Sequence, residues 1–325
     1  MHKIISFYIN LVNGSLNEKT VKKEPANLYD PIDYTLSLGG KRIRPALLML
    51  ANNLFDGDDK MALNSALAIE VFHNFTLLHD DIMDEAPLRR GEPSVYKKWN
   101  TNVAILSGDV MLMQSIQLLS KKNHPNLHRV LSIFNATAIQ VCEGQQYDMD
   151  FENSTTVSID DYLKMIELKT AVLLAASLKI GAVISNASSD NAHHIYEFGK
   201  NLGIAFQLMD DILDLYGDPK KVGKRIGGDV IVNKKTYLLL KAQELATGKS
   251  KKDLEFCLSS SVLDDDTKVE KVKTIFNSLN IKKLAVEEMN LFYNTAISHL
   301  DSIDANESKK RVFEQFAKGL MNREN

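Results

Sequence analysis

The chain has 325 residues, of which 44% are hydrophobic and 25% are charged, and its formal net charge is −3. These values are typical of a globular protein, exclude a disordered or collagen-like chain, and argue against a nucleic-acid-binding protein. The low content of proline and glycine, 7 and 16 residues, disfavours a turn-rich all-β protein. The two cysteines, Cys142 and Cys257, lack the number and spacing of a disulfide scaffold or a zinc site.

Hydrophobic residues recur at helical spacing along nearly the whole chain. The apolar run Ile4–Val12 predicts a first helix, because it lacks the cleavage site of a signal peptide. Apolar stripes predict two long helices, over Met61–Met83 and Asp161–Ser185. The stretch Gly248–Lys271 is the most polar, and we expect a surface connection or a solvated helix there.

Polar, glycine-bearing or proline-bearing stretches interrupt this pattern and predict helix breaks. They are Pro25–Pro31, Asp56–Lys60, Pro87–Pro93, Lys121–Asn126, Glu152–Ser158, Asn186–Asn191 and Gly217–Lys235. No composition shift, repeat or strand–helix alternation accompanies them, so we expect one all-α domain over residues 1–325. No uninterrupted apolar run reaches the roughly 18 residues that span a bilayer. We therefore expect no transmembrane segment and a cytoplasmic location.

Two predicted helices each end in the pattern Asp-Asp-x-x-Asp. The first cluster is Asp80, Asp81 and Asp84, and the second is Asp210, Asp211 and Asp214. On a helix the three carboxylates lie within an arc of about 100°, where they repel one another unless a cation lies among them. Oxygen ligands of this kind suit Mg²⁺. One copy alone is as readily explained as a solvated acidic face, whereas two copies favour a metal site for a polyanion.

Basic residues are dispersed along the chain in step with the two aspartate clusters. They are Lys41, Arg42, Arg44, Arg89, Arg90, Lys169, Lys224, Lys234 and Lys235. Lys169 interrupts an apolar helix, where a charge is costly unless it is paired or faces a ligand. Guanidinium and ammonium groups bind phosphate oxygens well. Each cation alone is most simply a solvated charge, but the set as a whole predicts diphosphate binding.

In this order, the motifs resemble those of the polyprenyl synthetase family, the trans-isoprenyl diphosphate synthases that include farnesyl and geranylgeranyl diphosphate synthases. They are Gly40-Lys41-Arg42-Ile43-Arg44-Pro45; Leu78-His79-Asp80-Asp81-Ile82-Met83-Asp84 with Arg89-Arg90-Gly91; Gly144-Gln145-x-x-Asp148; Lys169-Thr170; and Phe206-Gln207-x-x-Asp210-Asp211-x-x-Asp214 with Gly223-Lys224-x-x-Gly-Gly-Asp229. The resemblance covers roughly residues 30–245. It implies the all-helical isoprenoid synthase fold, usually as a homodimer, with the two aspartate motifs facing each other across a central cavity.

The resemblance also implies a reaction and its site residues. An allylic diphosphate ionises with the help of three Mg²⁺ ions, the double bond of isopentenyl diphosphate attacks the carbocation, and a proton is lost. The implied catalytic residues are Asp80, Asp81, Asp84, Lys169, Asp210 and Lys224, and the implied metal ligands are Asp80, Asp84, Asp210 and Asp214. The implied contacts are Arg89, Lys169, Thr170, Gln207, Lys224 and Lys234 for the allylic substrate, and Lys41, Arg44, His73 and Arg90 for isopentenyl diphosphate.

Three positions qualify this transfer. A lone histidine on an apolar helix is usually a packed core residue, but His73 lies two turns before Asp80 on the same face. The first aspartate motif has the short form, whereas many bacterial relatives carry two extra residues. The interval from Lys224 to Lys234 is one residue longer than in some relatives, which weakens the assignment of Lys234.

Product length is expected to depend on the helix that carries Asp80, because the growing tail should run along it. A turn rises about 5.4 Å, near the length of one isoprene unit. Thr76 leaves room one turn below Asp80, and Phe72 would close the next layer. In the family an aromatic residue at the position of Phe75, beside a small residue, accompanies C20 or C15 products, although Phe75 is nearly as well explained as core packing. We expect geranylgeranyl diphosphate, with farnesyl diphosphate or a longer product as alternatives.

Three other functions compete with this reading. A class I terpene cyclase would carry an Asn/Ser/Glu motif in place of the second aspartate cluster. A non-catalytic subunit of a heteromeric synthase typically lacks one of the two clusters, and both are present here. A helical interaction protein without catalytic activity would leave the paired clusters unexplained.

Overall fold

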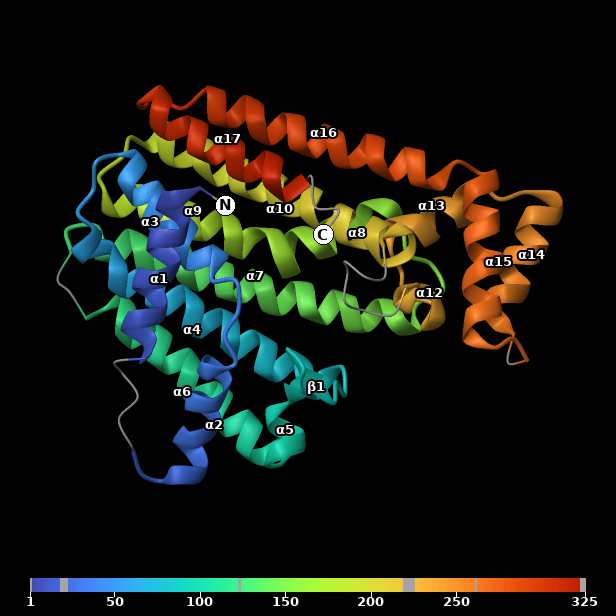
Figure 1. Cartoon of the computed structure of the whole chain (residues 1–325), viewed down its shortest axis with the longest axis horizontal. Coiled ribbons are helices and arrows are strands. Elements are labelled where there is room, and N and C mark those ends of the chain that lie inside the picture. Colours follow the sequence, from blue (N-terminus) through green and yellow to red (C-terminus); the bar gives the residue numbers. More distant parts are fainter. Residues whose placement is uncertain (1, 18–22, 122–123, 219–225, 261, 322–325) are drawn as a thin grey trace. The chain divides into compact units, whose positions relative to one another are not determined.

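The computed structural model describes residues 2–17, 23–121, 124–218, 226–260 and 262–321 (Figure 1). The elements are α1 (Lys3–Asn17), α2 (Ala26–Ser37), α3 (Ile43–Leu54), α4 (Asp59–Met83), β1 (Leu88–Arg89), β2 (Glu92–Pro93), α5 (Val95–Lys98), α6 (Thr101–Leu119), α7 (Leu127–Asn153), α8 (Ile159–Ile166), the π-helix η1 (Glu167–Ala171), α9 (Val172–Ile184), α10 (Ser189–Tyr216), α12 (Gly228–Ile231), α13 (Tyr237–Leu245), α14 (Gly248–Ser259), α15 (Asp265–Ser278), α16 (Ile281–Asp301) and α17 (Glu307–Met321). Within these residues the two strands form the one β-hairpin, so the all-α prediction is confirmed.

The chain divides into two compact units. Unit 1 comprises Met1–Thr137, Leu173–Tyr196 and Ser302–Val312, and unit 2 comprises Ala138–Val172, Glu197–Asp301 and Phe313–Asn325. Helices α7, α9, α10 and α17 contribute residues to both units. The expectation of a single domain stays a prediction.

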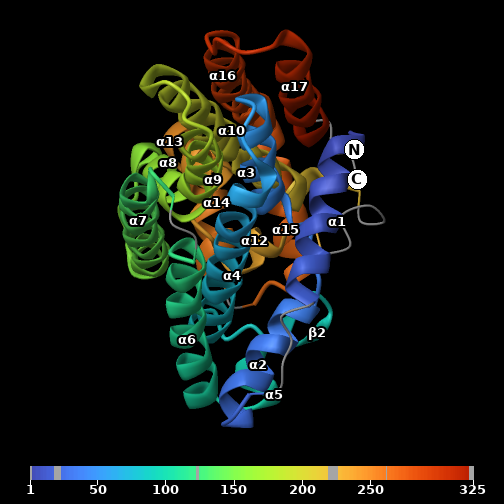
Figure 2. The same cartoon turned by 90° about the vertical axis from the view of Figure 1, so that its left-hand side faces the viewer.

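Unit 1 is built around α4. Helices α4 and α6 pack side by side, α3 packs on α4, and α1 packs on α3 (Figures 1 and 2). Helix α3 is buried from Pro45 to Asn52 because its sequence is apolar on almost every face. Asp58 caps the start of α4, because its side chain accepts a hydrogen bond from the Lys60 amide (2.9 Å), and the helix ends at Met83. The first aspartate motif is therefore held at the end of a buried helix.

The two strands of the hairpin after α4 are joined by a two-residue turn. Leu88 pairs with Pro93 and Arg89 with Glu92, and the turn residues Arg90 and Gly91 have φ angles of 56° and 85°. Positive φ at both central residues suits the right-handed twist of the paired strands. The hairpin presents Arg89 and Arg90 close to the first aspartate motif.

Unit 2 has its own hydrophobic core. Helix α13 packs on α16, and α15 packs on α12, α14 and α16. Tyr162, Leu208, Leu239 and Phe276 are among the buried residues of this core. Side-chain caps begin three of its helices, with Ser158 at α8, Thr236 at α13 and Asp264 at α15. Within this unit, α10 carries the second aspartate motif in its last two turns.

Two local features differ from the sequence pattern, and a third agrees with it. The break expected through Pro31 is wrong, because α2 starts at Ala26 and continues through Pro31 in its second turn, although the missing N–H of this proline removes one backbone hydrogen bond. The helix expected over Asp161–Ser185 is interrupted by η1. The polar stretch Gly248–Lys271 forms α14 and the first half of α15, so the solvated-helix alternative is confirmed.

Helices α4 and α6 are long and apolar enough to cross a membrane by length and composition alone. The relevant window of α4 is 67% buried inside the protein, and that of α6 is 33% buried. Core helices of globular proteins pass the same test, so the two helices are weak support for a membrane span. The expected absence of a transmembrane segment stays a prediction.

Candidate functional site

The first aspartate motif divides into one buried and two accessible carboxylates. Asp81 is 3% exposed, whereas Asp80 is half-buried and Asp84 is exposed. Arg89 donates to Asp81 from Nε (2.8 Å) and from one terminal nitrogen. Burial raises the pKa of Asp81, and the hydrogen bonds from Arg89 oppose that rise. The protein itself thus supplies the cation for Asp81, while Asp80 and Asp84 reach the surface.

The second motif shows the same division. Asp211 is 5% exposed and accepts hydrogen bonds from the Tyr162 hydroxyl and from Nε2 of Gln207 (3.2 Å). Burial raises the pKa of Asp211 to about 7, although the hydrogen bond from Tyr162 acts in the opposite direction. Asp210 is exposed and Asp214 is half-buried. The middle aspartate of each motif is therefore held by protein partners.

Asp214 is tied to the segment that follows the second motif. Its Oδ2 accepts a hydrogen bond from the backbone N–H of Asp229 (3.1 Å). The backbone N–H of Lys234 in turn donates to the carbonyl of Asp229 (2.8 Å). The charge of Lys234 lowers the pKa of Asp211, so Lys234 acts electrostatically on the second motif. Lys224 lies outside the described residues.

Lys169 and Thr170 lie in the π-helix η1, in agreement with the tendency of such turns to mark functional sites. Lys169 Nζ is 2.5 Å from Oδ2 of Asp148, and the Thr170 hydroxyl donates to Oε1 of Gln207 (3.4 Å). Gly144 allows α7 to approach this turn, because a Cβ there would lie 2.7 Å from the Lys169 Cα. The costly charge of Lys169 is thus paired within unit 2.

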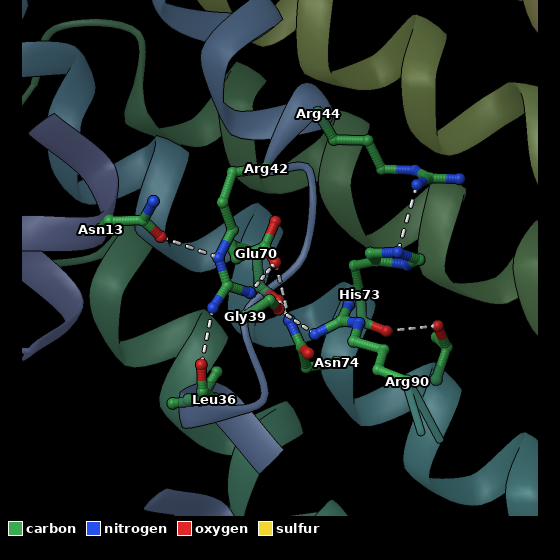
Figure 3. Close-up of polar contacts among 10 residues, drawn as sticks. Asn13, Leu36, Gly39, Arg42, Arg44, Glu70, His73, Asn74 and Arg90 are labelled. Atoms are coloured by element: carbon green, nitrogen blue, oxygen red, sulfur yellow. Dashed lines mark hydrogen bonds and ion pairs between the residues drawn. The ribbon is translucent and has the colours of Figure 1, made fainter. Parts of the chain in front are cut away.

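A cluster of cationic side chains lies at the start of α3 and faces α4 (Figure 3). Nη1 of Arg44 is 3.2 Å from Nε2 of His73, and Nη1 of Arg90 donates to the carbonyl of Gly39. A Cβ at Gly40 would lie 2.9 Å from Cζ of Arg90, so this glycine lets the guanidinium pack on the backbone. Three of the four residues expected to bind isopentenyl diphosphate, Arg44, His73 and Arg90, are gathered within unit 1, and Lys41 adjoins them in the chain.

The electrostatics of this cluster favour an anion. Burial lowers the pKa of His73 well below its ordinary value, and the charges of Arg44, Arg90, Arg89 and Arg42 lower it further. His73 is therefore neutral beside the guanidinium groups. A neutral imidazole and several guanidiniums suit the oxygens of a phosphate group.

The residues expected to limit product length belong to an aromatic row. The ring of Phe72 is 5.6 Å from that of Phe75 and 5.1 Å from that of Phe134, and Phe75 is 4.7 Å from His79. Phe72 is 1% exposed and Phe75 is 8% exposed, which fits a packed wall. The Thr76 hydroxyl donates to the His73 carbonyl (2.8 Å).

The acidic residues fit a hard cation by their chemistry. Asp80 and Asp84 of unit 1, and Asp210 and Asp214 of unit 2, offer only carboxylate oxygens, the ligands that Mg²⁺ prefers. In the part of the chain that the structure describes, no three acidic, histidine or cysteine side chains converge closely enough to hold a metal by themselves. Mg²⁺ commonly takes one or two carboxylates and completes its shell with water and substrate phosphates.

Several residues of the site had no role assigned from the sequence. They are Glu70, Phe134, Asp148, Tyr162 and Asp229. Asp148 and Asp229 lie inside recognised motifs, so their chemistry was visible but their partners were not. Glu70, Phe134 and Tyr162 resemble ordinary helical residues, and only the tertiary packing places them beside motif residues.

Comparisons with known proteins agree with this geometry. The family model "Polyprenyl synthetase" matches residues 25–279. The chain is 40% identical over 235 residues to a geranylgeranyl diphosphate synthase of Methanosarcina mazei, covering 72% of each chain. It is 39% identical over 252 residues to a short chain isoprenyl diphosphate synthase of Methanocaldococcus jannaschii, covering 77% of each.

Solved structures show the same fold. A crystal structure of a geranylgeranyl pyrophosphate synthase is similar with a TM-score of 0.93 and 39% identity, covering 100% of both chains. The geranylgeranyl pyrophosphate synthetase of Pyrococcus horikoshii has a TM-score of 0.91 at 31% identity, covering 98% of this chain and 97% of the other.

Proposed function

The chain belongs to the polyprenyl synthetase family, and from that premise we propose that it condenses isopentenyl diphosphate with an allylic diphosphate. The allylic C–O bond breaks, diphosphate leaves with the electron pair, and the isopentenyl double bond forms a new C–C bond to the allylic carbon. Loss of a proton then forms the product double bond. The product that the relatives support is geranylgeranyl diphosphate, with 20 carbons.

One observation carries this proposal. In both aspartate motifs the middle carboxylate is engaged by a protein partner, Asp81 by Arg89 and Asp211 by Tyr162. The outer carboxylates differ from the middle ones in being half-buried or exposed, so a ligand can reach them through a cation. A matched pair of such motifs has no purpose in a helical interaction protein.

We assign the outer carboxylates Asp80, Asp84, Asp210 and Asp214 as ligands of Mg²⁺. When bound, the metal would supply positive charge to the leaving diphosphate. Lys169 and Arg89 are proposed to bind the allylic diphosphate and to stabilise the charge that develops as the C–O bond breaks. Lys224 and Lys234 share that role in the proposal, together with Thr170 and Gln207.

The isopentenyl substrate is assigned to the cluster on α3 and α4. Arg44, Arg90 and Lys41 would bind its diphosphate, and neutral His73 would donate or accept one hydrogen bond. Because these groups hold the diphosphate end, they orient the reacting double bond without taking part in bond formation. The homodimer and the cytoplasmic location stay predictions from the sequence.

A product assay tests the proposal. Purified protein is incubated with Mg²⁺, labelled isopentenyl diphosphate, and dimethylallyl, geranyl or farnesyl diphosphate in turn, and the dephosphorylated products are sized by chromatography. A C20 alcohol is the expected product. A C15 product or a ladder beyond C25 would keep the reaction and overturn the assigned length. Absence of elongation with every primer would contradict the proposed function, and cyclic hydrocarbons would identify a cyclase.

A further inference from the structure

Arg42 belongs to the cation-rich motif but is enclosed by protein. Its side chain is 2% exposed, whereas the neighbouring Lys41 is exposed. Three nitrogens of its guanidinium group have partners, because Nε donates to Oδ1 of Asn13 (3.1 Å), Nη2 donates to the carbonyl of Leu36 (2.6 Å), and Nη1 donates to Oε1 of Glu70. Figure 3 shows these partners on different sides of the guanidinium. Arg42 therefore has little capacity left for a substrate phosphate.

Glu70 is equally enclosed and completes the contact. Its side chain is 3% exposed, and the Oε1 atom that binds Arg42 also accepts a hydrogen bond from Nδ2 of Asn74 (2.8 Å). A buried ion pair contributes to a fold only when its remaining polar atoms are satisfied, and this one is closed by amide groups and a backbone carbonyl. The pair thus fixes its partners in one geometry.

The backbone at Arg42 needs such support. The residue has φ 48° and ψ 33°, a left-handed conformation that is unfavourable for a residue with a Cβ. Gly39 and Gly40, just before it, also have positive φ. The turn that carries Lys41 is therefore held in shape by the contacts of the Arg42 side chain.

A second contact follows two residues later. Arg44 meets His73 at 3.2 Å, one turn of α4 beyond Glu70. The start of α3 is thus attached to α4 at two points, Arg42 to Glu70 and Arg44 to His73 (Figure 3). Two attachments fix the rotation of α3 as well as its position, which one attachment would leave variable.

We infer that Arg42 is a positioning residue, which, held by Glu70 and by Asn13 of α1, aims Lys41 and Arg44 at the diphosphate of isopentenyl diphosphate. The role rests on the proposed function and assigns to α1, distant in sequence from the motifs, a part in substrate affinity. Arg42 itself does not touch the substrate.

The test compares kinetic constants of the full-length chain and its variants. Arg42→Lys is expected to raise the KM for isopentenyl diphosphate by between about tenfold and a hundredfold, because misplacement of a binding group by about 1 Å has effects of this size. The KM for the allylic substrate and kcat at saturation are expected to stay within about twofold. Loss of kcat and both affinities together would indicate a structural role and overturn the inference.

Glu70→Gln distinguishes positioning from direct binding. If Arg42 binds the diphosphate directly, removal of the Glu70 charge frees a cation and lowers the KM for isopentenyl diphosphate. If Arg42 is a positioning residue, the same substitution loosens the turn and raises that KM by about threefold to tenfold. A lower KM would overturn the inference.

Asn13 supplies a milder test, should the buried variants fail to fold. Asn13→Ala removes the acceptor for Nε of Arg42 and is expected to raise the KM for isopentenyl diphosphate by about threefold, on the scale of one hydrogen bond. Asn13→Asp keeps the acceptor and should retain the wild-type KM. Equal constants for Asn13→Ala and wild type would contradict the inference.

A matched control is Lys310→Gln. Lys310 is also a buried cation of unit 1, and its Nζ donates to the Ile303 carbonyl (3.1 Å). Its substitution should lower stability and leave the KM for isopentenyl diphosphate unchanged. Wild-type turnover with unchanged constants in every Arg42 and Asn13 variant would overturn the positioning role alone. A wild-type chain without turnover would overturn the proposed function and with it this role.

Discussion

Arg89 donates two hydrogen bonds to the same oxygen of Asp81, the middle carboxylate of the first aspartate motif. The second motif has a counterpart in the contact of Tyr162 with Asp211. In each motif the middle carboxylate is therefore buried against a protein partner, whereas its neighbours are half-buried or exposed. This division makes the residues of one motif experimentally distinguishable.

Asp80→Asn and Asp81→Asn are expected to act differently. Asp80→Asn should lower kcat/KM by about 10²–10³-fold, as loss of one electrostatic contact in a transition state commonly does, and should raise the Mg²⁺ concentration for half-maximal activity. Asp81→Asn should leave that Mg²⁺ concentration within about twofold and lower stability by about 1–3 kcal/mol, because Arg89 loses its charged partner. A metal titration of both variants checks this. The same metal shift in both would contradict the division.

Tyr162→Phe should lower the free energy of unfolding by about 1–3 kcal/mol, since the buried Asp211 loses a hydrogen bond. Chemical denaturation in the presence of a chelator measures this change. Tyr216→Phe is the matched control in unit 2, because its hydroxyl donates to Asn277 (3.0 Å) at the exposed surface. We expect less than about 0.5 kcal/mol there. Equal losses in the two variants would argue against a special role for the Asp211 contact.

Gly144→Ala should disturb the turn that carries Lys169. The added Cβ would lie 2.7 Å from the Leu168 carbonyl carbon and the Lys169 Cα, and backbone atoms cannot yield as flexible side chains do. We expect a loss of about 1–3 kcal/mol in stability and a higher KM for the allylic substrate. Gly319→Ala is the control, because nothing lies within 4 Å of its added Cβ. A helical alanine there should stabilise by about 0.5–1 kcal/mol. Thermal unfolding and kinetics of the two variants test the difference.

Product length should respond to the aromatic row. Phe72→Ala and Phe134→Ala each remove a ring from a pair at 5.1 Å, and Phe75→Ala removes the ring next to it. We expect products longer by one or more isoprene units from at least one of these variants. Phe313→Leu interrupts a similar aromatic pair in unit 2 and should leave the product unchanged. Chromatography of the dephosphorylated products measures their length. An unchanged product length in all three alanine variants would show that other residues limit it.

His73 should make stability depend on pH. Burial lowers its pKa well below 6.5, so between the folded-state pKa and pH 6.5 the unfolded chain binds more protons than the folded chain. The free energy of unfolding therefore falls as pH falls below 6.5, and above that value His73 adds no pH dependence. The slope reaches at most about 1.4 kcal/mol per pH unit. His73→Gln should lack this contribution, which denaturation of both proteins at three pH values would show. Parallel curves would contradict the expectation.

The residues of the site could be predicted from the sequence motifs, and much of the fold could be predicted from the hydrophobic periodicity. Asp80 and Asp210 could be found because each motif repeats at fixed spacing on an apolar helix. The π-helix could not, because one additional residue in a turn leaves no trace in a hydrophobic pattern. Lys169 could be found from its motif and as a charge within an apolar helix, whereas its partner Asp148 depends on how α7 packs.

Buried partners were the least predictable part. Tyr162 and Glu70 are ordinary residues on helical faces, and each becomes informative only when a motif residue lies against it. Pro31 shows the reverse, since a residue that usually ends helices lies near the start of one. In each case the tertiary environment decides between alternatives that local spacing leaves equal.

The internal pairing of Asp81 also affects how the protein matures. An acidic cluster without compensation would repel itself in the apo chain and make folding await the metal, as in zinc fingers. Here Arg89 cancels the innermost charge of the first motif before any ion arrives. Folding and metal binding can then be separate, reversible events. A chelator should abolish the activity of such a protein without unfolding it.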